Sequence, residues 1–128
     1  MTTVTKTSVP LVAPVTNNGV INKSKSDPGV SSGWIDIRAY DGGNLGLSIL
    51  NGASGPGSAP SLVIQWSPDG TSTKVYDLLM YGGDTAGSSY NSATFWIDPG
   101  IPYIRVIGYG NTTNPVTFGA DFSGVARA

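Results

Sequence analysis

The chain has 128 residues, a formal net charge of -1 and only 12% charged residues. His, Cys and Glu are all absent, which removes the thiol nucleophile, the Ser-His and Cys-His pairs and the commonest metal ligand. The seven Lys and Arg residues form no basic stripe, so we expect no catalysis, no cofactor and no binding to nucleic acid.

Residues 1–30 are predicted to form an extended arm. Pro10 and Pro14 interrupt a Val-rich alternation, and each proline removes a backbone donor from any strand ladder, which favours an edge strand or an arm lying on a surface. A disordered leader is the alternative that the Ser, Thr and Asn content allows. The apolar side chains that this arm would offer to a partner are those of Val9, Pro10, Val12 and Val15.

No stretch of the sequence has the pattern of a targeting or membrane segment. Residues 1–14 lack a continuous apolar run, and nowhere do about eighteen apolar residues follow one another. We therefore expect synthesis in a cytoplasm and no membrane partner.

The next segment predicts a strand over Trp34–Tyr40 with alternating faces. Asp41–Asn44 then has the Asp-Gly chemistry of a hairpin turn, and Leu45–Ile49 alternates as the returning strand. Trp34 and Tyr40 share a face with Asp36 and Arg38, a mixture that suits a sheet surface covered by a partner. An ordinary solvated strand face is the alternative.

A second hairpin is predicted around residues 61–80. The strand Ser61–Trp66 runs into Ser67–Gly70, where Pro and Gly stand at the positions that a type I turn prefers. On the returning strand Lys74–Met80, the predicted core face is formed by Tyr76, Leu78 and Met80. Loops rich in Gly and Ser flank this hairpin at 51–60 and 81–92.

The stretch Ala93–Asn111 is predicted to be a strand, turn and strand that form a hairpin. Asp98, Pro99 and Gly100 supply the turn, and the core side chains are Ile97, Ile104 and Val106. Trp96, Arg105 and Tyr109 of the same stretch are predicted partner contacts, because Trp, Tyr and Arg are enriched at interfaces. A last strand over residues 116–122 has the cleanest alternation, with Val116, Phe118, Ala120 and Phe122 on one face.

Together these elements predict an all-β chain. With 18 glycines and 9 prolines, turns are frequent and no helical periodicity survives over a dozen residues. Seven to eight short strands indicate a two-sheet antiparallel β-sandwich, jelly-roll-like, with an extended N-terminal arm. We assign residues 1–30 to the arm and residues 31–128 to the sandwich domain.

The sequence offers little chemistry. The eight aspartates scatter over turns and polar strand faces, where Asp commonly bonds to local backbone, so a hydrolase that works with Asp alone is a remote reading. A calcium site at Asp41 and Asn44, or at Asp84, lacks the spaced oxygen ligands that such loops carry. Exposed aromatic residues fit either a sugar-stacking platform or interface anchors, and the sequence does not choose between them.

Two short motifs carry a resemblance to a known group of proteins. IQWSPDG at Ile64–Gly70 and PYIRV at Pro102–Val106 resemble a pattern in small β-sandwich virion proteins of tailed bacteriophages, and they are also similar to discoidin-type sugar-binding sandwiches. The resemblance covers roughly Gly33–Ser123 and leaves the arm unmatched.

The phage resemblance implies a structural virion protein, made in the host bacterial cytoplasm. It would act as a capsid decoration or cement protein that binds the outer phage head. Its implied partners are the major capsid protein and further copies of the same chain, through oligomeric and arm contacts. The alternative is a carbohydrate-binding tail-fibre or adhesin module.

Overall fold

The computed structural model describes residues 5–16 and 22–126, and within residues 5–16 it describes the backbone alone. These residues form nine strands and no helix, hence no helix long and apolar enough to cross a membrane. The strands are β1 (Thr5–Thr16), β2 (Val30–Ser31), β3 (Ile35–Asp36), β4 (Tyr40–Asn51), β5 (Ser61–Ser67), β6 (Tyr76–Gly82), β7 (Tyr90–Ile97), β8 (Tyr103–Tyr109) and β9 (Val116–Ala126).

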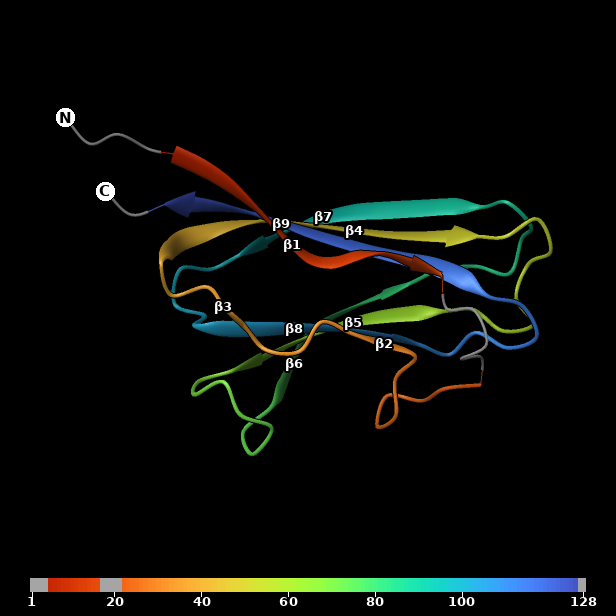
Figure 1. The fold of residues 1–128 in the computed structure, drawn as a ribbon, viewed down its shortest axis with the longest axis horizontal. Coiled ribbons are helices and arrows are strands. Elements are labelled where there is room, and N and C mark those ends of the chain that lie inside the picture. The colour runs from red at the N-terminus through yellow and green to blue at the C-terminus, as the bar shows by residue number, and fades with distance from the viewer. Residues whose placement is uncertain (1–4, 17–21, 127–128) are drawn as a thin grey trace.

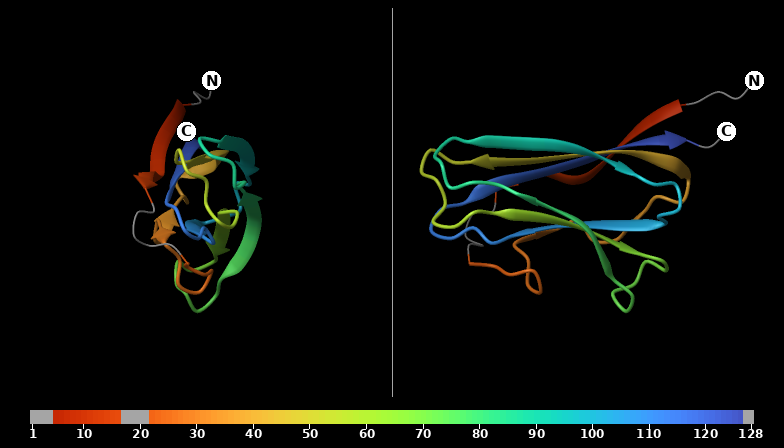
Figure 2. Two further views of the ribbon diagram at one scale, coloured as in Figure 1. Left: turned by 90° about the vertical axis from the view of Figure 1, so that its right-hand side faces the viewer. Right: turned by 180° about the vertical axis from the view of Figure 1, so that it is seen from behind.

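The strands form two antiparallel sheets that stack face to face (Figures 1 and 2). One sheet has the order β1-β9-β4-β7, and the other has the order β2-β8-β5-β6 with β3 also paired to β8. From β6 onward, consecutive strands alternate between the two sheets. This is the strand order of a jelly roll, so the predicted jelly-roll-like sandwich is confirmed.

The core lies between the sheets because strict alternation turns every second side chain inward. On β9, Val116, Phe118, Ala120 and Phe122 are buried as predicted. On β4, the buried side chains are those of Leu45, Leu47 and Ile49, and the facing sheet contributes Leu62, Ile64, Ile104 and Val106.

Strand β1 belongs to the sandwich. Its backbone pairs antiparallel with β9 from Thr5 opposite Ala126 to Thr16 opposite Thr117, with two register shifts on the way. Val9, Pro10, Val12 and Val15 are register partners of Phe122, Asp121, Ala120 and Phe118. The arm is thus an edge strand of its own chain over these residues, while the boundary between residues 30 and 31 stays a prediction.

The hairpin predicted for Ala93–Asn111 is wrong in its pairing. Strand β7 lies beside β4 in the four-stranded sheet. Strand β8 lies in the five-stranded sheet, where it pairs with β5 on one side and with both β2 and β3 on the other. The turn at Asp98–Gly100 therefore carries the chain from one sheet to the other, closed by a bond from the Ile101 N–H to the Asp98 carbonyl. The predicted core residues of this stretch, Ile97, Ile104 and Val106, are fully buried.

The hairpin turn predicted at Asp41–Asn44 is also wrong. Strand β4 runs straight through these residues, with a register shift against β9 between Tyr40 and Gly43. Gly42 has a φ of 78°, which a glycine adopts without strain, so Asp-Gly here serves an irregularity within a strand. Of the strand predicted for Trp34–Tyr40, residues Ile35–Asp36 pair, and their partner is β8.

The hairpin of β5 and β6 is confirmed, but the core face predicted for β6 is not. Tyr76 is 52% exposed and Met80 is 61% exposed, while Leu78 and the neighbouring Leu79 are both partly buried against the core. A register shift between Ile64 and Gln65 breaks the alternation across this pair. Because the side-chain period of a strand is two, one such shift moves residues to the opposite face.

Candidate functional site

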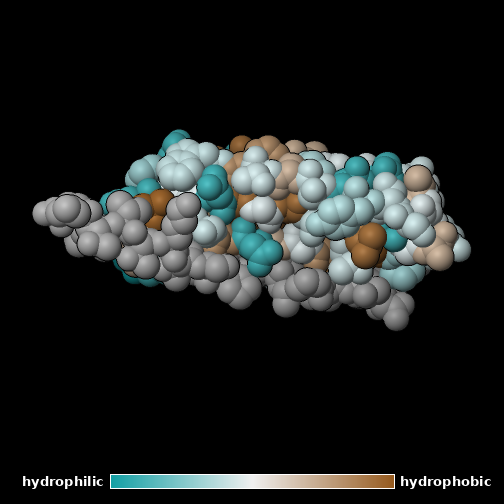
Figure 3. Space-filling view, turned by 90° about the horizontal axis from the view of Figure 1, so that it is seen from above, coloured by the Kyte–Doolittle hydropathy of each residue, from teal (hydrophilic) through white to brown (hydrophobic). Residues whose placement is uncertain are grey.

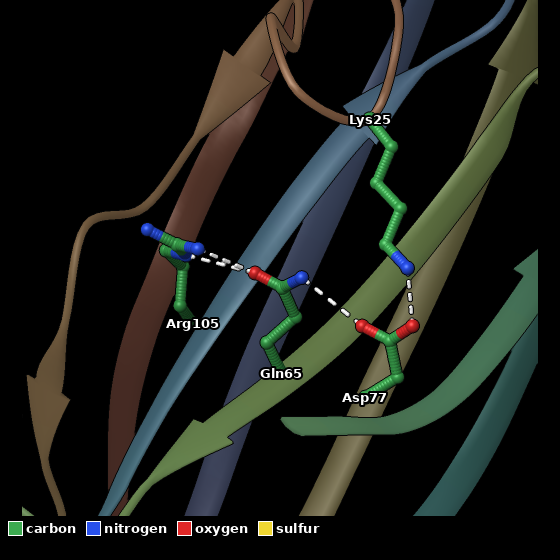
Figure 4. A network of polar contacts seen from close by, with 4 residues as sticks. All are labelled: Lys25, Gln65, Asp77 and Arg105. Atoms are coloured by element: carbon green, nitrogen blue, oxygen red, sulfur yellow. Dashed lines mark hydrogen bonds and ion pairs between the residues drawn. The ribbon is translucent and has the colours of Figure 1, made fainter. Parts of the chain in front are cut away.

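A row of polar side chains crosses the outer face of the five-stranded sheet (Figure 4). Gln65 on β5 is the register partner of Arg105 on β8 and of Asp77 on β6, so three adjacent strands bring these side chains into line. Lys25 reaches the end of the row from the short Ser24–Asp27 turn.

The row is held by a continuous series of hydrogen bonds. The Arg105 guanidinium donates from Nε and Nη2 to Gln65 Oε1 at 3.1 and 2.6 Å, and Gln65 Nε2 donates to Asp77 Oδ1 at 3.0 Å. Lys25 Nζ donates to the other oxygen of the Asp77 carboxylate. Gln65 is 6% exposed, so its amide is both buried and fixed at its oxygen and its nitrogen.

The charges along the row are unequally compensated. The hydrogen bond from Lys25, and then that from Gln65, lowers the pKa of Asp77, and Asp77 in turn raises the pKa of Lys25. Arg105 contacts no carboxylate among the described residues, and burial lowers the pKa of its guanidinium. The row therefore holds two cations and one carboxylate, and the uncompensated charge is that of Arg105.

An open groove of about 550 Å³ lies beside Arg105. The lining residues are Ser24, Lys25, Ser26, Pro28, Ser31, Gln65, Arg105 and Ile107. The indole of Trp34 stacks on the Arg105 guanidinium, with 4.5 Å from Cζ to the ring centroid. Cation and ring thus orient each other next to a groove rich in hydroxyl groups.

The outer face of the four-stranded sheet is different. A trough of about 320 Å³ is lined there mostly by small residues, with Leu47, Tyr90 and Asp121 as its larger members. Tyr90 is 63% exposed, and Trp96, further along β7, is 51% exposed. Figure 3 looks onto this side of the molecule and shows mostly pale or teal surface with separate brown areas.

The predicted partner contacts do not form one site. The structure brings Trp34 and Arg105 together on one sheet and leaves Trp96 exposed on the other. Tyr40 packs edge-on against Phe122, and Tyr109 is half-buried. The side chains of Val9, Pro10, Val12 and Val15 lie outside the described part of the structure, and partner contact by all nine residues stays a prediction.

Sequence reasoning missed Lys25, Gln65 and Asp77. Lys25 and Asp77 are 52 residues apart, and Gln65 and Arg105 are 40 apart, so no local spacing joins them. The available signal was a single polar Gln65 within the otherwise apolar run Leu62–Trp66. A buried amide in such a run requires hydrogen-bond partners from neighbouring strands.

Two aspartates outside this row, Asp69 and Asp84, hold loops by hydrogen bonds. The Asp84 carboxylate accepts bonds from Ser89, Asn91 and Asn51, and the Asp69 carboxylate accepts from Ser67 and Thr71 within its own turn. Among the described residues no three potential ligands gather in a way that could hold a metal ion.

Comparison with known proteins gives structural neighbours. No protein-family model matches the chain, and no curated protein matches it by sequence. A chain in the structure of infectious bursal disease virus strain Gx aligns with a TM-score of 0.51 and 11% identity, over 97% of this chain and 32% of the viral one. At that identity the likeness shows a common fold, and this chain spans about a third of the viral chain.

Two further structures align less closely. One is a protein of Bacillus endospore appendages, described as disulfide-linked pili, with a TM-score of 0.49, 11% identity and coverage of 100% and 92% of the two chains. The other is a Clostridium thermocellum xylanase fragment with CBM22-1 and GH10 modules, complexed with xylohexaose. It has a TM-score of 0.45, 11% identity and coverage of 93% and 26%.

Proposed function

We propose that this chain is a non-enzymatic structural protein of a virion. It decorates the outer surface of a phage head and stabilises it through contacts with the major capsid protein and with other copies of itself. The observation that carries the proposal is a set of large apolar side chains left exposed on a sandwich with an otherwise complete core. They are Leu50, Tyr76, Met80, Tyr90 and Trp96, with exposed fractions from 43% to 63%.

Four of these side chains lie on strands at the ends of the two sheets. Tyr76 and Met80 are on β6, and Tyr90 and Trp96 are on β7, the last strand in each sheet order. Leu50 is the register partner of Tyr90, so these two side chains meet on one outer face. Exposed apolar groups next to unpaired strand edges mark surfaces that a partner covers.

Strand β1 offers a second contact. It ends the order of the four-stranded sheet, and among residues 5–16 and 22–126 its one strand partner is β9. A strand of a neighbouring subunit or of the capsid protein can add to its other edge by main-chain hydrogen bonds. The arm contact predicted from the sequence would then be made by an arm that stays in its own sheet. Several weak contacts of this kind raise the overall affinity of an assembly.

Support also comes from the fold. Jelly rolls occur in viral capsid proteins and in lectins, and the neighbour with the highest of the three TM-scores is from a virus structure. One fold hosts many functions, so the likeness in fold supports a virion protein without distinguishing it from other functions. The residues of the site have to make that distinction.

The test is to add the purified chain to heads from the phage that encodes it, assembled without this protein. We expect saturable co-sedimentation in a fixed ratio to the major capsid protein and a higher temperature of DNA release. The double variant Tyr90→Ala, Trp96→Ala should bind more weakly, whereas Arg38→Ala, in the turn between β3 and β4, should bind like the wild type. Virions that carry the chain on the tail, or not at all, would contradict the proposal.

The second candidate is a carbohydrate-binding tail-fibre or adhesin module. The trough on the four-stranded sheet favours this function, because its small polar side chains leave room for the hydroxyl groups of a sugar. Tyr90 offers an exposed ring on which the sugar can stack. Glycan-array binding that disappears in both Tyr90→Ala and Asp121→Asn would select this function over head decoration. No binding on the glycan array, together with binding of the chain to phage heads, would select head decoration.

A further inference from the structure

The groove beside Arg105 lies on the five-stranded sheet, away from the exposed aromatic residues of β7. Its volume of about 550 Å³ falls within the range of small-molecule sites. A ligand there is independent of both functions proposed above, because none of the residues that line the groove is among the exposed side chains or the trough residues that those proposals use.

Arg105 is set up to accept an anion. A guanidinium has five N–H donors, and Gln65 Oε1 takes the bonds from Nε and Nη2. The one other polar contact of the group runs from Nη1 to Ser72 Oγ at 3.5 Å, which is long for a hydrogen bond. Donors on Nη1 and Nη2 thus remain for a ligand, and a half-buried cation without a counter-ion gains from pairing with one.

The guanidinium is also held in place before any ligand binds. Gln65 fixes one edge and is itself fixed by Asp77, while the Trp34 ring covers one face at 4.5 Å. Trp34 is not part of the groove lining, so the ring does not compete for the side that faces the groove. Such preorganisation lowers the entropic cost of binding.

The remaining lining is complementary to hydroxyl groups. Ser24, Ser26 and Ser31 contribute three hydroxyls around the groove. The Ser24 and Ser26 hydroxyls share one hydrogen bond at 3.2 Å, and Ser31 Oγ accepts from the Gly33 N–H at 3.3 Å, so all three can still accept and two of them can still donate. A bare carboxylate would leave these groups to water, and a neutral sugar would leave the Arg105 charge unpaired. A carboxylate carried on a polyhydroxylated ring satisfies both.

We propose that this groove binds an acidic sugar residue, with the sugar carboxylate on Arg105 and the ring hydroxyls on the serines of the Ser24–Asp27 turn and Ser31. Lys25, which also lines the groove, stays bonded to Asp77.

The test uses the whole chain and four probes: D-glucuronate, D-glucose, acetate and a triglutamate peptide. The chain has three arginines, Arg38, Arg105 and Arg127, so the side-chain Nε–Hε NMR signal of Arg105 is readily assigned. We expect glucuronate to shift this signal saturably. Glucose and acetate should need about ten-fold higher concentrations or more, since each lacks one set of the bonds. Triglutamate should also bind more weakly, because it lacks the hydroxyls.

Variants locate the site. Arg105→Met keeps the apolar stem of the side chain and should abolish glucuronate binding. Saturation-transfer NMR on the sugar measures that binding. Arg38→Met is the matched control, because Arg38 also stacks on a ring, that of Tyr103, yet is paired with Asp36. If Arg105→Met does not fold, Ser26→Phe fills the groove from an exposed turn, and Ser92→Phe fills the trough on the other sheet as its control.

Three results would overturn the proposal. Acetate as effective as glucuronate would make this a simple anion contact, and triglutamate binding more tightly than glucuronate would make it a peptide site. Glucuronate binding that survives both Arg105→Met and Ser26→Phe would place the sugar elsewhere. None of these outcomes depends on whether the chain binds phage heads.

Discussion

The two outer faces of the sandwich are organised by different interactions. All three ion pairs between described residues, Lys23–Asp27, Lys25–Asp77 and Arg38–Asp36, belong to the side of the five-stranded sheet. The four-stranded sheet instead presents small polar side chains with Tyr90 and Trp96 standing exposed. One face is ordered by ion pairs and hydrogen bonds, and the other exposes two aromatic side chains among small polar residues.

The difference teaches that the two outer faces can differ widely while the interior stays common to both. Both sheets share one interior, whose large side chains are almost fully buried. The faces are free to differ because neither supplies the core. Substitutions of buried residues should therefore lower the free energy of unfolding more than substitutions on either outer face.

Phe118→Ala should lower the free energy of unfolding by about 3–5 kcal/mol and should disturb both faces together. Phe118 is fully buried, and its ring lies so close to the opposite sheet that a Cβ on Gly108 would stand 2.8 Å from it. Urea unfolding gives the value, with Phe95→Ala as the control because Phe95 is only partly buried. An equal loss in both variants would show that depth does not govern stability here.

Asn51→Asp should cost about 1–3 kcal/mol, since it replaces a buried donor with a charge. Asn51 is 2% exposed, and its Nδ2 donates to the Asp84 carboxylate at 3.0 Å and to the Ala86 carbonyl at 2.9 Å. The new carboxylate would face that of Asp84. Asn44→Asp makes the same change at an exposed position of the same strand, and its unfolding should match the wild type. A similar loss at both positions would show that the buried hydrogen bonds of Asn51 to Asp84 and Ala86 are not the cause of the effect.

Acid should weaken the charged face first. Pairing with Lys25 lowers the pKa of Asp77, and Arg38 lowers the pKa of Asp36 to about 2. A carboxyl whose pKa is lowered on folding stabilises above the unfolded value of about 4, and the stability is lost as pH falls through the folded pKa. The free energy of unfolding of Asp77→Asn should thus fall less than that of the wild type between pH 4 and 2.

The control for this pH series is Ser92→Ala, on the other face, which changes no titratable group and should keep the wild-type acid profile. Asp36 and Asp84, whose pKa is also lowered by local hydrogen bonds, contribute to the same loss of stability in acid. Their share of that loss should persist in Asp77→Asn. Identical profiles for both variants would break the contrast between the faces.

Trp96→Ala should change stability by no more than about 0.5 kcal/mol, because half of the indole is already in water. Its effect should appear in binding to heads or glycans. Thermal unfolding together with co-sedimentation separates the two readouts. A large loss of stability would show that Trp96 belongs to the fold and not to a contact surface.

The sequence predicted those parts of the fold in which local pattern and tertiary structure agree. Phe118 and Phe122 follow a strict alternation, and the Ser67–Gly70 turn joins strands that do pair. It misjudged Asp98–Gly100, because the same turn chemistry serves a hairpin and a crossing between sheets. Tyr76 and Met80 were misplaced because a register shift leaves no mark in the sequence of β6 itself.

The candidate site was predictable only in part. Trp34 and Arg105 were identified as partner contacts from their residue types, but their stacking depends on β8 passing beside residues that precede it by some 70 positions. Gln65 and Asp77 become neighbours through the β5–β6 hairpin, whereas Lys25 and Arg105 join them only through the jelly-roll order. Long-range pairing of this kind is a property of topology, and local spacing does not carry it.

The pairing of β1 with β9 also gives the molecule a direction. Thr5 and Ala126 are register partners, so peptides fused before one and after the other leave from the same end of the sandwich (Figure 1). The loops at 52–60 and 111–115 lie at the opposite end, where Asn51 pairs with Val116. The chain can therefore be tethered by both ends to one support while loops and both sheet faces stay accessible. That geometry suits the display of inserted epitopes.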